Sequence, residues 1–133
     1  MEEERFRLRQ GVQIVGYMRS VGRLTFYSKD SFWWNGSSVD YTTMDKWSGL
    51  KDRNNTQLFA GDIVEFEPIP DKGVDSGALL LKEGFWVLKS VTTDVEYPVH
   101  ALGLQLYKGN DLRWLSYLFL NPQLAEYWGF VEE

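Results

Sequence analysis

The chain has 133 residues, a formal net charge of −5 and no cysteine, and 16% of its residues are aromatic, six of them tryptophan. This length predicts one domain over residues 1–133 with a single core. The missing cysteines exclude disulfides, thiolate metal sites and a cysteine nucleophile. The charged N-terminus lacks the apolar core of a signal peptide, and no apolar run is long enough to span a bilayer, so we expect a cytoplasmic protein without a membrane contact.

The first half of the chain alternates apolar and polar residues with period two, which is typical of strands with one buried face. The expected strands cover residues 5–9, 12–18, 23–27, 32–34 and 41–47. In the first of them, Phe6 and Leu8 face the core, and Arg5, Arg7 and Arg9 lie on the opposite face.

The second half continues as strand, interrupted by proline and glycine. The expected strands cover residues 63–67, 78–81, 85–91, 102–107 and 113–120, with an exposed loop over 68–77 and a bend at 96–98. Asn121 as N-cap and Pro122 at the first helical position predict a short C-terminal helix that ends at Gly129. The predicted fold class is therefore mainly β, a bent sheet or partly open small barrel with a short C-terminal helix.

Residues 48–64 carry two turn signals between predicted strands. Asn54 and Asn55 tolerate positive φ, so they predict a two-residue hairpin turn. Gly61 and Asp62 predict a second turn, which starts the strand over residues 63–67. This segment therefore specifies backbone corners and supplies no obvious catalytic group.

The same segment, Ser-Gly-Leu-Lys-Asp-Arg-Asn-Asn-Thr-Gln-Leu-Phe-Ala-Gly-Asp-Ile-Val, resembles the signature of the YopX-like proteins of phages and prophages. The residues identical to that signature are Gly49, Leu50, Lys51, Asp52, Asn54, Gly61, Asp62, Ile63 and Val64. Asn55 and Ala60 depart from the family's typical glycine and glutamate. A second match lies at residues 116–125, where Asn121, Pro122 and Leu124 agree. The resemblance implies a small, mainly β, partly barrel-like domain encoded by a phage or prophage, and it implies no activity and no catalytic residue.

No group of residues predicts catalysis. His100 is the single histidine, so a zinc site would need three carboxylates beside it, and we interpret it as structural or exposed. Asp62, Glu65 and Glu67 form the best carboxylate cluster, and an acid–base pair or a divalent-metal site is the alternative to a turn cap and a solvated strand face. The sequence predicts a protein that is not an enzyme and needs no cofactor.

The arginines near the N-terminus admit two interpretations. Arg5, Arg7 and Arg9, extended by Arg19 and Arg23, can keep an edge strand soluble. With exposed aromatic residues, they can also form a face on which single-stranded bases stack. The negative net charge disfavours nucleic acid, so a small β-barrel nucleic-acid-binding protein is the alternative function.

The adjacent tryptophans Trp33 and Trp34 are the least expected element. Neighbouring strand residues point to opposite faces, so both cannot be inward in a sheet with one buried face. Tryptophan is prominent among interface hot spots, and Tyr127 and Trp128 raise the same question. We take these four as candidate partner-binding residues of a phage-encoded accessory protein of unknown molecular function. It would act without catalysis by binding a protein partner such as a host factor, and its oligomeric state stays open.

Overall fold

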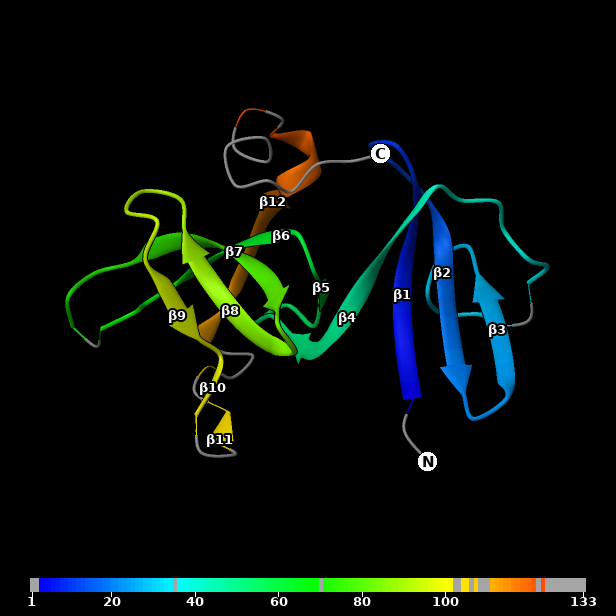
Figure 1. Cartoon of the computed structure of the whole chain (residues 1–133), viewed down its shortest axis with the longest axis horizontal. Coiled ribbons are helices and arrows are strands. Elements are labelled where there is room, and N and C mark those ends of the chain that lie inside the picture. Colours follow the sequence, from blue (N-terminus) through cyan, green and yellow to red (C-terminus); the bar gives the residue numbers. More distant parts are fainter. Residues whose placement is uncertain are drawn as a thin grey trace. The chain divides into compact units, whose positions relative to one another are not determined.

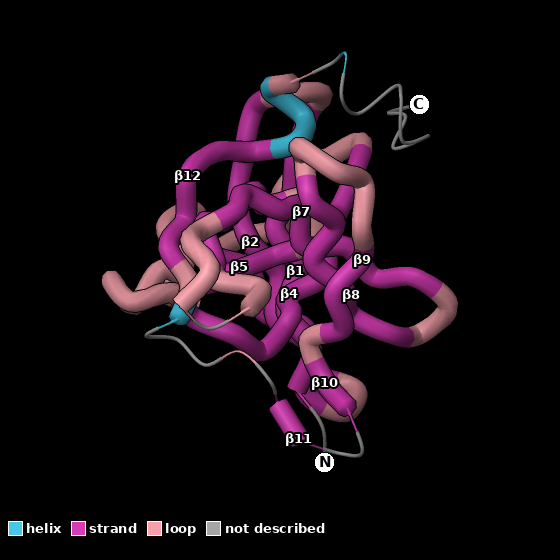
Figure 2. Tube along the Cα trace, turned by 90° about the vertical axis from the view of Figure 1, so that its left-hand side faces the viewer, coloured by secondary structure: helices cyan, strands magenta, loops and turns pink. Residues whose placement is uncertain are grey.

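The fold is mainly β, as predicted from the alternating sequence pattern. The computed structural model describes residues 3–34, 36–69, 71–101, 104, 105, 107, 111–121 and 123. Within these residues nearly all regular structure is strand (Figure 2), and both five-stranded sheets are antiparallel. Neither of these sheets closes into a barrel in the described part of the chain.

The described residues fall into two compact units, one within Met1–Trp47 and the other within Ser48–Phe130. The boundary lies inside a long strand, β4 (Thr43–Lys51). The prediction of one domain over residues 1–133 stays a prediction, because two compact units can belong to one domain or to two.

The first unit is built around two hairpin-like strand pairs (Figure 1). Its strands are β1 (Glu3–Gln10), β2 (Gln13–Val21), β3 (Leu24–Ser28) and the first part of β4. The hydrogen-bonded order of the sheet is β3-β2-β1-β4-β5, where β5 is Gln57–Phe59. β1 is therefore a central strand, paired with β2 on one side and β4 on the other.

The second unit contains the other five-stranded sheet, in the order β12-β6-β7-β8-β9. Its strands are β6 (Asp62–Phe66), β7 (Asp75–Lys82), β8 (Phe85–Ser90), β9 (Glu96–Pro98) and β12 (Arg113–Tyr117). A small pair, β10 (His100–Ala101) and β11 (Leu104–Gln105), follows β9. A 3-10 helix, η2 (Leu118–Leu120), follows β12.

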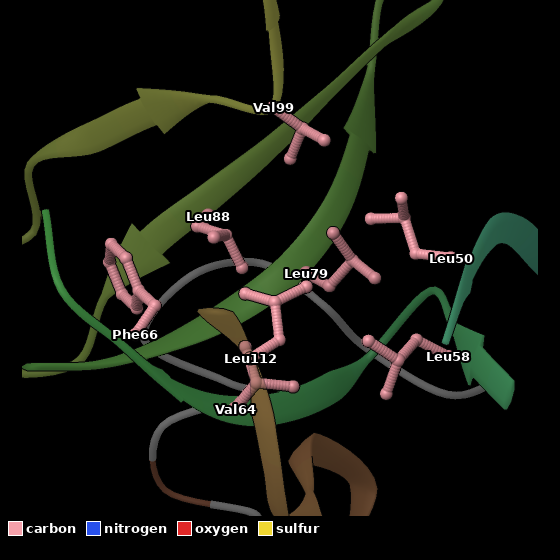
Figure 3. Close-up of a cluster of buried hydrophobic side chains, with 8 residues drawn as sticks. All are labelled: Leu50, Leu58, Val64, Phe66, Leu79, Leu88, Val99 and Leu112. Atoms are coloured by element: carbon pink, nitrogen blue, oxygen red, sulfur yellow. The ribbon is translucent and has the colours of Figure 1, made fainter. Parts of the chain in front are cut away.

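The core of the second unit is a set of aliphatic side chains around one phenylalanine. Figure 3 shows these side chains converging from the strands and from the segments between them. The cluster consists of Leu50, Leu58, Val64, Phe66, Leu79, Leu88, Val99 and Leu112. The ring of Phe66 also makes edge contacts with Tyr97 and Tyr107, with centroids 5.5 and 5.6 Å away, so several predicted strand aromatics are core residues.

The segment that resembles the YopX-like signature forms two corners, as predicted, but the first turn is longer than expected. Asn55 has φ 64°, its N–H donates to the carbonyl of Asp52, and the Asp52 N–H donates to the carbonyl of Thr56. The loop therefore has three residues, the next commonest hairpin length after two. At the second corner Gly61 has φ 90°, and the Asp62 carboxylate accepts the Phe59 N–H at 2.8 Å.

Asp52 also joins its corner to a distant strand. Its carboxylate accepts the N–H groups of Asn54, Thr56 and Trp114, each at 2.9 Å. Burial raises the pKa of this carboxyl group, but the hydrogen bonds from Trp114, Thr56 and Asn54 outweigh burial and lower the pKa overall. An acidic residue of the signature is thus a structural cap that ties β12 to the hairpin.

Several predicted elements differ from the structure. Residues 32–34 are irregular instead of a strand, β7 begins at Asp75 inside the expected loop, and residues 96–98 form β9 instead of a bend. Residues 118–120, expected as the end of a strand, form η2. The predicted C-terminal helix falls, apart from Gln123, outside the described residues.

We expect Gly77→Ala to lower the free energy of unfolding by about 1–3 kcal/mol, the usual cost of overpacking a core. A Cβ at this position would lie 2.7 Å from Cε1 of Phe66 and 3.3 Å from the backbone oxygen of Lys89. Urea unfolding of the variant measures the loss. In a Phe66→Leu background the added methyl group has room, so the same substitution should cost less, and equal costs in both backgrounds would refute the predicted clash.

We expect Asp52→Asn to lower the free energy of unfolding by about 2 kcal/mol at pH 7, because three N–H groups lose a charged acceptor. The pKa of Asp52 is lower in the folded than in the unfolded chain, so its stabilisation is complete above the unfolded value and disappears as pH falls through the folded value.

The difference between wild type and this variant should therefore shrink below about pH 4, as measured by urea unfolding from pH 7 to pH 3. Asp71→Asn, at an exposed residue with φ 64°, is the matched control and should change little at any pH. A pH-independent difference for Asp52→Asn would contradict this assignment.

Candidate partner-binding site

The arginines of β1 are neutralised inside the first unit. Arg7 and Arg9 are 2% and 0% exposed, and both donate to the carboxylate of Asp45, which lies opposite Arg7 on β4. The Nε atoms of Arg7 and Arg9 lie 2.9 and 2.7 Å from Oδ2, and an Nη of Arg9 lies 2.8 Å from Oδ1. The interpretation of this stripe as edge protection is wrong, because β1 is central and these two side chains are buried.

Arg5 continues the same face and lies over the rings of two tryptophans. Its guanidinium carbon lies 5.6 Å from the ring centroid of Trp34 and 5.0 Å from that of Trp47. Arg19, opposite Arg5 on β2, lies 5.9 Å from the Trp34 ring. Glu3 forms ion pairs with both arginines, and the hydrogen bond from Arg5 lowers the pKa of Glu3 despite partial burial. Cation–π contacts of this kind hold Trp34 against the sheet.

The segment that follows β3 is fixed by two short polar side chains. Ser28 Oγ accepts the N–H groups of Asp30 and Ser31 and donates to Asp30 Oδ1. The same Oδ1 accepts the N–H groups of Phe32 and Trp33 at 2.9 and 3.1 Å. These backbone hydrogen bonds lower the pKa of Asp30 and outweigh its desolvation. The turn is thus ordered by its own side chains, in the manner of Asx and Ser turns.

This turn holds two large aromatic side chains in solvent. Phe32 is 83% exposed and Trp33 is 73% exposed, whereas Trp34 is half-buried. The prediction that Trp33 and Trp34 cannot both point inward is therefore confirmed. Beside Trp33 lies an open groove of about 570 Å³, lined also by residues 28–30 and 36–39.

We define the aromatic loop as residues 28–39, without the undescribed residue 35. Its far end returns to the sheet, where the Gly36 N–H donates to the carbonyl of Tyr27 at 3.0 Å. The aromatic loop is therefore tied to β3 through Ser28 and Gly36, and Trp34 contacts Arg5 and Arg19. The aromatic loop therefore presents an apolar, aromatic contact surface with a polar groove next to it.

The remaining candidate residues do not join this site. Tyr127 and Trp128 lie outside the described residues. His100 is exposed on β10, Glu65 makes a two-pronged ion pair with Arg113, and Glu67 accepts the Asp71 N–H. Arg113 holds the pKa of Glu65 below its usual range. Among the described residues, no three His, Asp or Glu side chains gather as metal ligands would.

Sequence reasoning did not single out Phe32 or Asp30. A signal was present, because Ser28 and Asp30 two residues apart, at the end of a strand, are typical of a side-chain-capped turn. Such a turn excludes the strand that was expected over residues 32–34. Phe32 therefore moves into solvent beside Trp33 instead of alternating with it.

Comparisons of the chain with protein-family models, curated proteins and solved structures found no match. The likeness of residues 48–64 to the YopX-like signature therefore stays a resemblance. Across the described ranges, no helix has the length and apolar character needed to cross a bilayer.

We expect Trp34→Ala and Trp33→Ala to differ in stability although the residues are neighbours. Trp34→Ala removes the half-buried ring between Arg5 and Arg19 and should lower the free energy of unfolding by about 2 kcal/mol. Trp33→Ala truncates an exposed ring and should stay within about 0.5 kcal/mol of wild type. Urea unfolding of both variants measures the difference, and equal losses would contradict the anchoring role of Trp34.

Proposed function

We propose that the protein is a phage- or prophage-encoded accessory protein that works in the bacterial cytoplasm by binding a protein partner, such as a host factor, and catalyses no reaction. The observation that carries this proposal is the exposed pair Phe32 and Trp33 on a turn that is already ordered. Large aromatic side chains supply much of the binding energy of protein interfaces. An ordered loop loses little conformational entropy on binding, which strengthens the contact.

The surroundings of the acidic residues also favour a binding role. Glu65 is paired with Arg113, and the carboxylates of Asp52 and Asp62 accept backbone N–H groups at corners. Each of these carboxylates has a structural partner, so a hydrolytic acid–base pair would have to break existing interactions. The phage or prophage origin rests on the resemblance of residues 48–64 to the YopX-like signature.

Nucleic-acid binding remains the second candidate, and the ion pairs weaken it. Arg5 and Arg19 pair with Glu3, and Arg7 and Arg9 pair with Asp45. A phosphate would compete with these carboxylates for the same guanidinium groups. Binding to a single-stranded oligonucleotide at low salt, with a steep loss of affinity at moderate salt, would revive this function.

We expect a photo-crosslinking residue, p-benzoylphenylalanine, at position 33 to capture one host protein from a bacterial lysate, because the side chain lies in solvent on an ordered turn. The same residue at position 85 is the matched control, since Phe85 is 74% exposed but belongs to the other unit. Mass spectrometry identifies the captured protein.

Competition makes this experiment specific. An excess of unlabelled wild-type protein should abolish the crosslink at position 33, whereas an excess of Trp33→Ala should compete poorly. Identical captures from positions 33 and 85, or no specific capture at position 33, would refute the proposed function.

A further inference from the structure

One edge of the first sheet is open beside the aromatic loop. β3 is the outermost strand of its sheet (Figure 1), paired only with β2 over most of its length. The carbonyl of Tyr27 points away from β2, because it accepts the Gly36 N–H. Backbone groups two residues apart on a strand point the same way, so the N–H and carbonyl of Thr25 also point outward. The bridge to Gly36 covers the Tyr27 end of the edge and leaves Thr25 uncovered.

The side chains on this edge do not block the addition of another strand. Leu24 and Phe26 are 62% and 36% exposed, and they share one face because they lie opposite Val21 and Arg19. The pairing of β2 with β3 has no bulge, and the stretch from Leu24 to Phe26 contains no proline and no charge. Bulges, prolines and charges are the usual devices that keep an edge strand from pairing with another chain.

Three exposed charged residues, Arg23, Lys29 and Asp30, lie around the edge. Arg23 precedes β3 and Lys29 follows it, and both are exposed without an ion pair to any described residue. Asp30, next to Lys29, stays ionised because the hydrogen bonds that its carboxylate accepts lower its pKa, so its charge offsets that of Lys29. The open edge is thus an uncharged stretch with one uncompensated cation, Arg23, at its β2 end.

We propose that the partner binds through a short extended segment that adds to β3 as a further strand and carries an acidic residue at the end that lies beside Arg23. This inference rests on the proposed function and names the chemistry of the partner. Main-chain hydrogen bonds to Thr25 supply affinity in this mode of recognition, and pockets for side chains supply specificity. The polar groove beside Trp33 is the pocket that takes a polar side chain of the segment. A second copy of the chain is a poorer occupant, because the residues that directly flank its own β3 are the cations Arg23 and Lys29 and not an acidic residue.

The test is a selection of random decapeptides from a display library on the full chain. Selected peptides should carry Asp or Glu on one side of an apolar core. They should lose binding at least tenfold to Thr25→Pro, because proline removes the outward N–H without removing a hydrogen bond to β2. Thr25→Val keeps the N–H and the shape of the side chain, so it is the matched control and should bind as wild type.

A second variant tests the proposal independently, in case Thr25→Pro does not fold. Arg23→Glu changes only an exposed charge and should weaken binding roughly tenfold. The proposal is overturned if no peptide is enriched, if enriched peptides lack acidic residues, or if they bind a folded Thr25→Pro as tightly as wild type. It is also overturned if light scattering shows a dimer that Thr25→Pro converts to a monomer, because a second copy then fills the edge.

The two proposals fail differently. If the host protein captured at position 33 binds Thr25→Pro as tightly as wild type, the aromatic contact stands and strand addition is wrong. If nothing specific is captured at position 33, the proposed function fails, whatever the peptides do.

Discussion

The need to neutralise buried guanidinium groups governs the first unit. Arginines at every second residue of β1 point to one face of a central strand, where desolvation of an unpaired charge costs several kcal/mol. The carboxylate of Asp45, on the neighbouring strand β4, neutralises Arg7 and Arg9 by accepting hydrogen bonds from both. Its position opposite Arg7 fixes which residues of β4 face which residues of β1. The charge pattern therefore contributes to the register of the sheet together with the apolar residues.

The same demand shapes the candidate site. Arg5 contacts both Trp34 and Trp47. The contact with Trp34 holds the segment after β3 against the sheet. Adjacent side chains on this segment cannot all turn inward, and Phe32 and Trp33 are left in solvent. Phe32 and Trp33 are thus exposed because Trp34 is anchored against the sheet. The arginines serve the contact surface indirectly, by holding its base in place.

Much of this fold follows from local sequence rules, whereas the environment of each strand does not. Period-two alternation predicts β1, β2 and β3, and the positive φ of Asn55 and Gly61 fits the predicted corners. Alternation says which residues share a face, but it does not say whether a strand is central or at an edge. That choice depends on pairing partners far along the chain, such as Arg7 with Asp45, and edge protection was therefore the wrong interpretation.

The candidate site was predicted only in part for the same reason. The expectation that Trp33 or Trp34 leaves the core holds, although the strand over residues 32–34 from which it was argued does not form. Which of the two leaves depends on Arg5 and Arg19, whose contacts with Trp34 join β1 and β2 to the segment after β3. The hydrogen bonds of Ser28 and Asp30 are local, yet they compete with strand formation, and propensity favoured a strand for two tryptophans.

The division of strand pairs along the chain has a consequence for biosynthesis. In the first unit β1, β2 and β3 pair with their immediate neighbours in sequence, and the partner of Arg7 is reached by residue 45. In the second unit β6 pairs with β12, which lies far along the chain, and this pairing places Arg113 opposite Glu65. Pairings of low sequence separation form fastest, and chains fold from the N-terminus as they leave the ribosome. The arginine-rich sheet can therefore assemble during translation, while β6 keeps an unpaired edge until residues 113–117 emerge from the ribosome.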